Sequence, residues 1–168
     1  MSLLFSTVVF GSASAQDNAE IYLLDGFNTS FAWGRHVSFD KIAVGLSNEG
    51  IYELRNDTIV MLVDFPGRPE ERICKISTDF MSGNKVFEMQ FFDGLQFVTA
   101  DTLGIYDPER SAVLDKTGKK RGDVEPSGKI LSPRKNVLLS FNARNVDPTL
   151  VAFFFLYHYT PRNKRDAE

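Results

Sequence analysis

The stretch VFEMQFFDGLQFVTADTLGIYD, residues 86–107, decides the expected fold. Apolar side chains alternate with others in its first part, at Phe87, Met89 and Phe91. The alternation stops at an Asp-Gly pair after residue 92 and resumes at Leu103 and Ile105. A period of two is typical of a half-buried strand, and Asp-Gly favours a turn. The stretch therefore predicts two strands joined by an acidic turn.

Further candidate strands, separated by turn residues, run through the rest of the chain: residues 21–24, 38–46, 51–54, 58–65, 72–80, 111–114, 137–141 and 150–159. The last of these, LVAFFFLYHY, is continuously apolar, which favours a strand covered on both faces. Residues 115–129 are polar without periodicity, and we expect a loop there. Short strands with turns between them predict an all-β fold, specifically an antiparallel β-sandwich of the jelly-roll-like type.

The composition is that of one globular domain. The chain has 168 residues, of which 43% are hydrophobic, and its 15 Phe favour strands over helices. The net charge of −3 gives no support for a nucleic-acid partner, because binding a phosphate backbone needs several cations on one face. No segment reaches the roughly 20 apolar residues that a membrane-spanning helix needs.

The N-terminus resembles a secretory signal peptide. An apolar run over residues 3–10 precedes small residues, and Ala13-Ser14-Ala15 fits the cleavage pattern before Gln16. The alternative interpretation is a first hydrophobic strand, because no cation lies near Met1. We prefer the signal peptide, residues 1–15, which predicts a secreted, extracellular protein.

Two glycosylation sequons agree with secretion, one at Asn28 and one at Asn56. Asn56 falls between two candidate strands, and we expect it to be exposed at a turn. Cys74 is the only cysteine, so no intramolecular disulfide can form. We interpret it as a small buried hydrophobic residue, with an intermolecular disulfide as the alternative.

The order of these features resembles a CUB domain over residues 50–159. Gly50-Ile51, the Pro-containing residues 65–69 and Cys74 follow the family's order, as do residues 86–92, Asp93 and residues 101–107. Leu139-Ser140-Phe141 and residues 153–159 resemble the family's closing strands. The resemblance implies a secreted β-sandwich that binds a partner. The two disulfides usual in that family are absent.

The resemblance also implies a possible calcium-binding site. Asp93 and Asp101 match two positions at which many CUB domains hold Ca²⁺, whereas the third falls at Ala143 and Arg144, which offer no carboxylate. Because Ca²⁺ takes six to eight oxygen ligands, we prefer a structured acidic turn, with the calcium site as the alternative. The chain gives no indication of any other cofactor.

Catalytic motifs are lacking. His36 and His158 are far apart in the sequence, and neither has an evident catalytic partner. The chain contains no glycine-rich phosphate loop and, with one Cys, no Cys-rich zinc site. We therefore predict that the protein is not an enzyme.

A basic segment lies between residues 116 and 135, where seven cations face two acidic residues. Lys119, Lys120 and Arg121 are its densest part and are candidates for binding an acidic partner. The simpler interpretation is a solvated loop.

These observations predict N-terminal strands over residues 16–49, a CUB-like sandwich over residues 50–159 and a charged tail over residues 160–168. The expected function is non-enzymatic recognition of an extracellular protein or glycan through loops at one end of the sandwich. The first alternative is a trimeric ligand of the tumour-necrosis-factor or C1q type, suggested by the Phe-rich strands. The second is a β-sandwich hydrolase, suggested only by the acidic turns.

Overall fold

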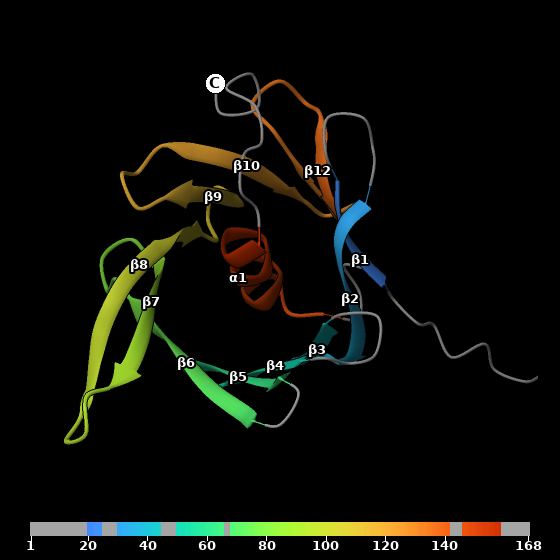
Figure 1. Ribbon diagram of the computed structural model, residues 1–168. Coiled ribbons are helices and arrows are strands. Elements are labelled where there is room, and N and C mark those ends of the chain that lie inside the picture. Colours follow the sequence, from blue (N-terminus) through green and yellow to red (C-terminus); the bar gives the residue numbers. More distant parts are fainter. Residues whose placement is uncertain (1–19, 25–29, 45–49, 66–67, 142–145, 159–168) are drawn as a thin grey trace, which may run out of the picture.

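The computed structural model describes residues 20–24, 30–44, 50–65, 68–141 and 146–158. These residues form antiparallel strands that curve around one short helix (Figure 1). The strands are β1 (Glu20–Leu24), β2 (Ser30–Ser38), β3 (Lys41–Val44), β4 (Gly50–Arg55), β5 (Thr58–Phe65), β6 (Arg68–Thr78), β7 (Lys85–Phe92), β8 (Phe97–Asp107), β9 (Ala112–Asp115), β10 (Lys120–Glu125), β11 (Lys129–Leu131) and β12 (Val137–Ser140). The helix is α1 (Pro148–His158).

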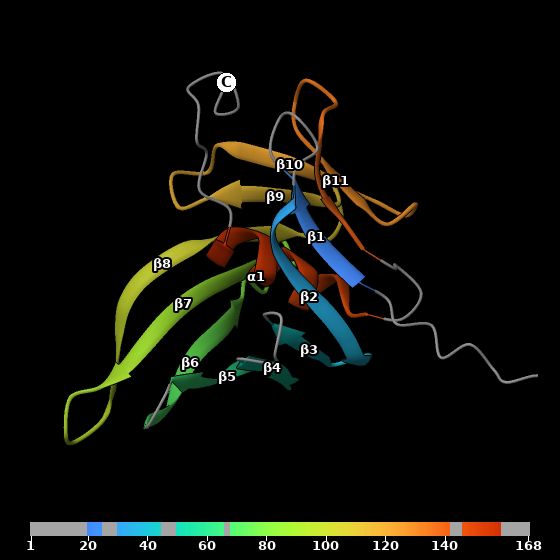
Figure 2. The same ribbon diagram turned by 45° about the vertical axis from the view of Figure 1, so that its right-hand side comes forward.

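The sheet follows the order of the chain. Each strand from β2 to β12 pairs antiparallel with its neighbours in sequence, and β1 pairs with both β2 and β12. Short connections of this kind are typical of antiparallel sheets. A turned view shows the strands passing on several sides of α1 (Figure 2).

Tight turns set the register of the hairpins. In β4 and β5, Arg55 pairs with Thr58 across a turn in which Asn56 has a φ of 56°. Asn tolerates this left-handed conformation better than most residues, which explains its place there. The predicted strands on either side of residue 56 are therefore confirmed, and Asn56 is exposed at the turn as expected.

Helix α1 supplies the centre of the core. Residues from Thr149 to Phe155 are all buried, so the helix is covered on every side. A helix that is apolar all round is stable only in such a position. Its start is marked by Asp147, whose carboxylate accepts a hydrogen bond of 2.7 Å from the backbone N–H of Thr149, and by Pro148 in the first helical position.

The strands turn alternate side chains toward this helix. Phe87 on β7 lies with its ring centre 6.0 Å from that of Phe153, and Tyr52 on β4 lies 5.7 Å from the same ring. Gly104 on β8 leaves room for Leu156, since a Cβ at residue 104 would lie 2.9 Å from the Leu156 Cδ2 atom. The sheet and the helix therefore share one core.

Three predictions about the elements need correction. Residues 150–159, predicted as the closing strand, belong instead to helix α1 as far as His158, because continuous apolar character fits a fully buried helix as well as a strand. Residues 115–129 contain β10 rather than a loop, and β6 begins at Arg68 rather than at Arg72.

The all-β prediction is confirmed in its coarser form, an antiparallel β-rich fold. A sandwich or jelly roll is not shown, because the described strands pair within one sheet. The predicted signal peptide, Asn28 and the charged tail lie outside the described residues. No helix in the described ranges is both long and apolar enough to cross a membrane.

Candidate functional site

The end of the β7–β8 hairpin exposes several large apolar side chains close together. We define the hairpin tip as residues 91–97. The exposed fractions of its apolar side chains are 52% for Phe91, 59% for Phe92, 92% for Leu95 and 52% for Phe97. Single exposed apolar residues are ordinary, but four within seven residues form a patch.

The tip lies beyond the neighbouring strands. Strand β6 pairs with β7 only as far as Gln90, and β9 pairs with β8 only from Gly104 onward. Two irregularities in the β7–β8 register, after Phe87 and after Met89, bend the hairpin on the way to its end. The hairpin consequently projects from the body of the molecule (Figure 1).

The turn that closes the hairpin is held by Asp93. Its Oδ1 atom accepts hydrogen bonds of 2.9 Å from the backbone N–H groups of both Leu95 and Gln96, and Gly94 takes a φ of 102°. The hydrogen bonds from Gln96 and then Leu95 hold the pKa of Asp93 below its usual value, so the carboxylate stays charged near neutral pH. The turn is thus held by hydrogen bonds within the chain.

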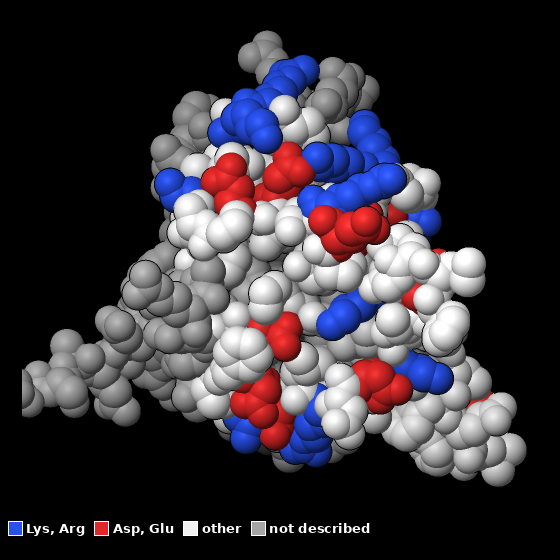
Figure 3. Space-filling view, turned by 180° about the vertical axis from the view of Figure 1, so that it is seen from behind, with Lys and Arg blue, Asp and Glu red and all other residues white. Residues whose placement is uncertain are grey.

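Two aromatic rings make the tip a continuous surface. Phe92 and Phe97 pair in register, and their ring centres lie 5.5 Å apart at an interplanar angle of 54°. Such a pair is favourable beyond its buried area, and it gives the tip a fixed shape. Seen from behind, the projecting end carries no basic residues on its visible face (Figure 3).

The structure gives the two predicted calcium ligands separate partners. Asp93 caps the turn, whereas Asp101 lies along β8 in register with Met89 and forms an ion pair of 3.1 Å with Lys116. Ala143 and Arg144 lie outside the described residues. Within the described part of the chain, no three His, Cys, Asp or Glu side chains form a group that could hold a metal ion.

The predicted basic cluster is placed on β10 and beside it, where most of its cations are matched by carboxylates. Lys120 pairs with Asp123, and Arg121 pairs with Asp115 at 2.8 Å. Lys119 is exposed. Blue and red residues accordingly mix on this part of the surface (Figure 3). The pairing agrees with the interpretation of a solvated face, although the predicted loop is a strand.

Cys74 lies in the core, whereas His158 is partly buried at the end of α1. Cys74 has no exposed surface, and burial raises the pKa of its thiol to about 12. The predicted buried role is confirmed, and an intermolecular disulfide through this sulfur is excluded by its burial. His158 lies 3.0 Å from the Tyr52 hydroxyl through its Nε2 atom. His36 lies in β2, where its backbone pairs with Ile42.

Sequence reasoning found the hairpin but not the exposure of its tip. The alternation of residues 86–92 predicted that Phe91 would share the buried face of Phe87, yet only Phe87 is buried. The missed signal is Phe92, which breaks the alternation just before the turn. Consecutive aromatic residues at a hairpin end cannot both face the core.

Comparison with known proteins gives no family. No family model matches the chain, and neither a curated protein nor a solved structure is significantly similar to it. The resemblance to CUB domains therefore stays a prediction, and one of its supports is lost because the expected closing strand is α1.

Proposed function

We propose that the chain is a secreted, non-enzymatic recognition module that binds an extracellular protein through the hairpin tip. The observation that carries this proposal is the exposed apolar tip on a projecting hairpin. Apolar and aromatic side chains at the centre of a contact provide most of the binding energy in protein interfaces. The signal-peptide-like N-terminus and the sequon at Asn56 support the extracellular setting.

The charge of the hairpin indicates the kind of partner. Residues 86–107 contain no Lys, Arg or His, and Asp93 places a carboxylate in the tip itself, whereas Asp101 is paired with Lys116 and Asp107 is buried. This charge disfavours nucleic acids and anionic membranes, which attract basic surfaces. It fits a protein that offers an apolar groove with Lys or Arg at its edge.

Photo-crosslinking tests the proposal. A crosslinking amino acid at position 95 should give one discrete adduct in extracellular fluid from the source organism. The paired change Phe92→Ser and Phe97→Ser should remove that adduct without lowering the melting temperature, because both side chains are already half exposed.

A crosslinker at position 80 is the matched control. Phe80 is 98% exposed but lies in the turn before β7, at the opposite end of the strand from the tip. Equal adducts from positions 80 and 95, or an adduct at position 95 that survives the serine changes, would contradict the proposal. Binding to a glycan array that persists in the serine variant would instead favour a glycan partner at another surface.

A further inference from the structure

A cavity of about 260 Å³ lies far from the hairpin tip, beside the start of α1. Its walls come from four strands or their ends and from the helix: Tyr106, Ser111, Val124, Glu125, Pro126, Phe141 and Pro148. Tyr106 stands nine residues along β8 from Phe97, which is roughly 30 Å of extended strand. The cavity is therefore a separate site.

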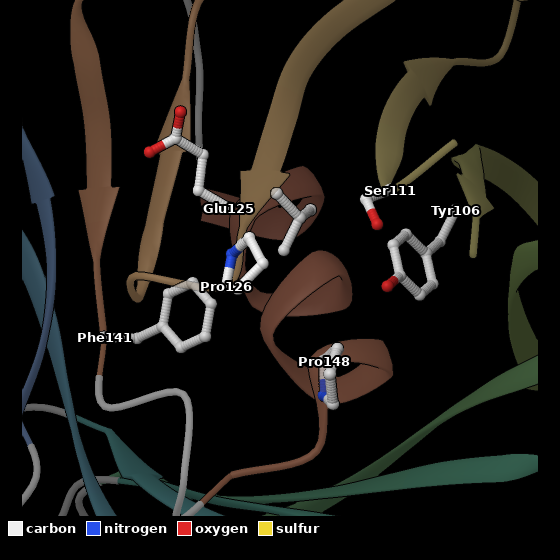
Figure 4. A pocket seen from close by; sticks show the side chains of 7 residues that line it. Tyr106, Ser111, Glu125, Pro126, Phe141 and Pro148 are labelled. Carbon is white, nitrogen blue, oxygen red and sulfur yellow. The ribbon is translucent and has the colours of Figure 1, made fainter. Parts of the chain in front are cut away.

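Tyr106 brings a side-chain hydroxyl group to the wall of the cavity. Tyr106 is only 7% exposed, yet its hydroxyl forms no hydrogen bond with any residue of the described chain. Figure 4 shows the Tyr106 hydroxyl pointing into the cavity. The hydroxyl is not one of the fully buried, unpartnered polar atoms of the described chain, so it remains open to a ligand or to solvent in the cavity.

Ser111 adds a second hydroxyl on the same side. It has a φ of 49°, and its carbonyl accepts a hydrogen bond of 2.6 Å from the N–H of Val124. This unusual backbone conformation is fixed by the strand beside it, and the Ser111 side chain lies near Tyr106 in Figure 4. The two hydroxyls can each donate or accept, so together they suit one polar group of a ligand.

Apart from Glu125, the remaining described residues of the lining are apolar. Val124 and Phe141 are almost completely buried, and the rings of Pro126 and Pro148 complete the wall. Rigid apolar walls with a few convergent polar atoms are typical of small-molecule sites. An apolar cavity of about 150 Å³ is known to hold benzene, so this one has room for a substituted ring.

The carboxylates around the cavity already accept hydrogen bonds from other groups of the protein. Glu125 turns away from Tyr106 in Figure 4 and accepts a hydrogen bond of 3.1 Å from the Ser127 hydroxyl. Asp107 accepts a hydrogen bond from the N–H of Arg110, and Asp147 caps α1. Burial, and then the charges of Asp147 and Asp107, raise the pKa of Tyr106, so its hydroxyl stays protonated. None of the described residues that line the cavity is a cation that could meet an anion.

From this arrangement we infer that the cavity binds a small, neutral, mostly apolar molecule with one hydroxyl or amide group. The apolar body lies against Val124, Phe141 and the two prolines. The polar group meets the hydroxyls of Tyr106 and Ser111. This inference does not depend on the hairpin tip.

Titration with simple probes, followed by NMR of the backbone amides, tests the site. We expect p-cresol to give saturable shifts at Ser111, Val124 and Glu125, with a dissociation constant in the roughly millimolar range usual for so few atoms. Toluene should bind more weakly, and 4-methylbenzoate should not bind, because its carboxylate would be buried without a cation.

Two variants separate the polar and apolar contributions. Tyr106→Phe should weaken p-cresol by about five-fold or more and leave toluene unchanged, because it removes only the hydroxyl. Val124→Phe should abolish the binding of both probes by filling the cavity. Ser111→Gly is a second test of the polar contribution, because glycine accepts the positive φ and the change removes the second hydroxyl; it should weaken p-cresol and leave toluene unchanged.

The inference would be overturned by shifts that do not saturate, or by p-cresol binding that Tyr106→Phe and Ser111→Gly leave unchanged. It would also be overturned by equal binding of 4-methylbenzoate. Circular dichroism melting confirms that each variant is folded before it is titrated. The crosslinking result at position 95 bears on the tip alone, so the two proposals fail independently.

Discussion

His158 links the end of α1 to β4 through a pair of partly buried side chains. Its ring stacks on Tyr52 with ring centres 5.7 Å apart, and its Nε2 atom lies 3.0 Å from the Tyr52 hydroxyl. Tyr157 and Phe154 also contact the imidazole. Burial lowers the pKa of His158 to about 4, so the ring is neutral at physiological pH and can accept a hydrogen bond from the Tyr52 hydroxyl.

This pKa predicts an acid-sensitive stability. Between pH 6.5 and about 4 the unfolded chain binds a proton at His158 that the folded chain does not, so the free energy of unfolding falls as the pH falls through this window. The His158 contribution is fully present above pH 6.5, and its loss is on the order of 3 kcal/mol by pH 4. Urea unfolding at a series of pH values measures it.

His158→Phe is the matched variant, because it keeps an aromatic ring and cannot titrate. Its unfolding free energy should be nearly constant from pH 6.5 to about 5, above the range in which Glu53, whose pKa the hydrogen bond from Arg55 holds below its usual value, loses its contribution. Asp115 and Asp123 have pKa values held below 3.8, so their contributions are lost only as the pH falls below that range. An equal pH dependence in both proteins between 6.5 and 4 would show that His158 is not responsible.

At the scale of elements, the approach of α1 to β8 depends on a missing side chain. A Cβ on Gly104 would collide with the carbonyl oxygen of Leu114 and come within 2.9 Å of Leu156. The backbone oxygen cannot move without disturbing the β8–β9 pairing, in which Gly104 lies opposite Asp115. We expect Gly104→Ala to reduce stability by roughly 1–3 kcal/mol, as overpacking does.

Thermal melting compares this variant with Thr99→Ala. Thr99 is exposed on the same strand, so alanine there should change stability by no more than about 0.5 kcal/mol. If both changes have the same small effect, the close packing of α1 on β8 is not as described.

The sequence predicted correctly those elements whose local pattern is compatible with only one kind of secondary structure. Residues 86–107 alternate and contain Asp-Gly, and they form β7, a turn and β8 as expected. Residues 150–159 have no alternation, so strand and helix were both compatible with them. The signal that distinguishes the two, and that the prediction missed, is Asp147-Pro148, an N-cap followed by proline, which marks a helix start.

Other features could not be predicted because they depend on distant residues. β10 has the sequence KRGDVE, and the ion pair of its Arg121 with Asp115 becomes visible only once β9 is alongside. The cavity beside Tyr106 joins residues up to 42 positions apart, from Tyr106 to Pro148, and no local pattern brings them together.

At the scale of the whole molecule, calcium is expected to leave stability unchanged. A specific ion would raise the melting temperature by mass action. Asp93 is occupied by two backbone N–H groups and Asp101 by Lys116, so neither is free to bind an ion without losing these contacts. Melting curves with millimolar Ca²⁺ and with a chelator should coincide. A rise with Ca²⁺ that Asp93→Asn removes would restore the calcium site.

We also expect a monomer at micromolar concentration. Outside the hairpin tip, the large exposed apolar residues of the described chain form only small groups: Ile51 opposite Leu62 on β4 and β5, Phe80 next to Met81 in one turn, and Phe39. Stable oligomers need a broad apolar face. Sedimentation equilibrium gives the mass directly, and a trimer would support the alternative of a tumour-necrosis-factor-like or C1q-like ligand.

The place of α1 in the chain has a consequence for synthesis. All twelve described strands precede the helix, yet the helix supplies the centre of their common core. While a ribosome is still making the strands, inward residues such as Phe87 and Ile59 have nothing to pack against. Exposed apolar strands of this kind are prone to aggregate. The nascent protein therefore completes its fold only after residue 158 has left the exit tunnel, and a chaperone that shields the strands until then would raise the yield.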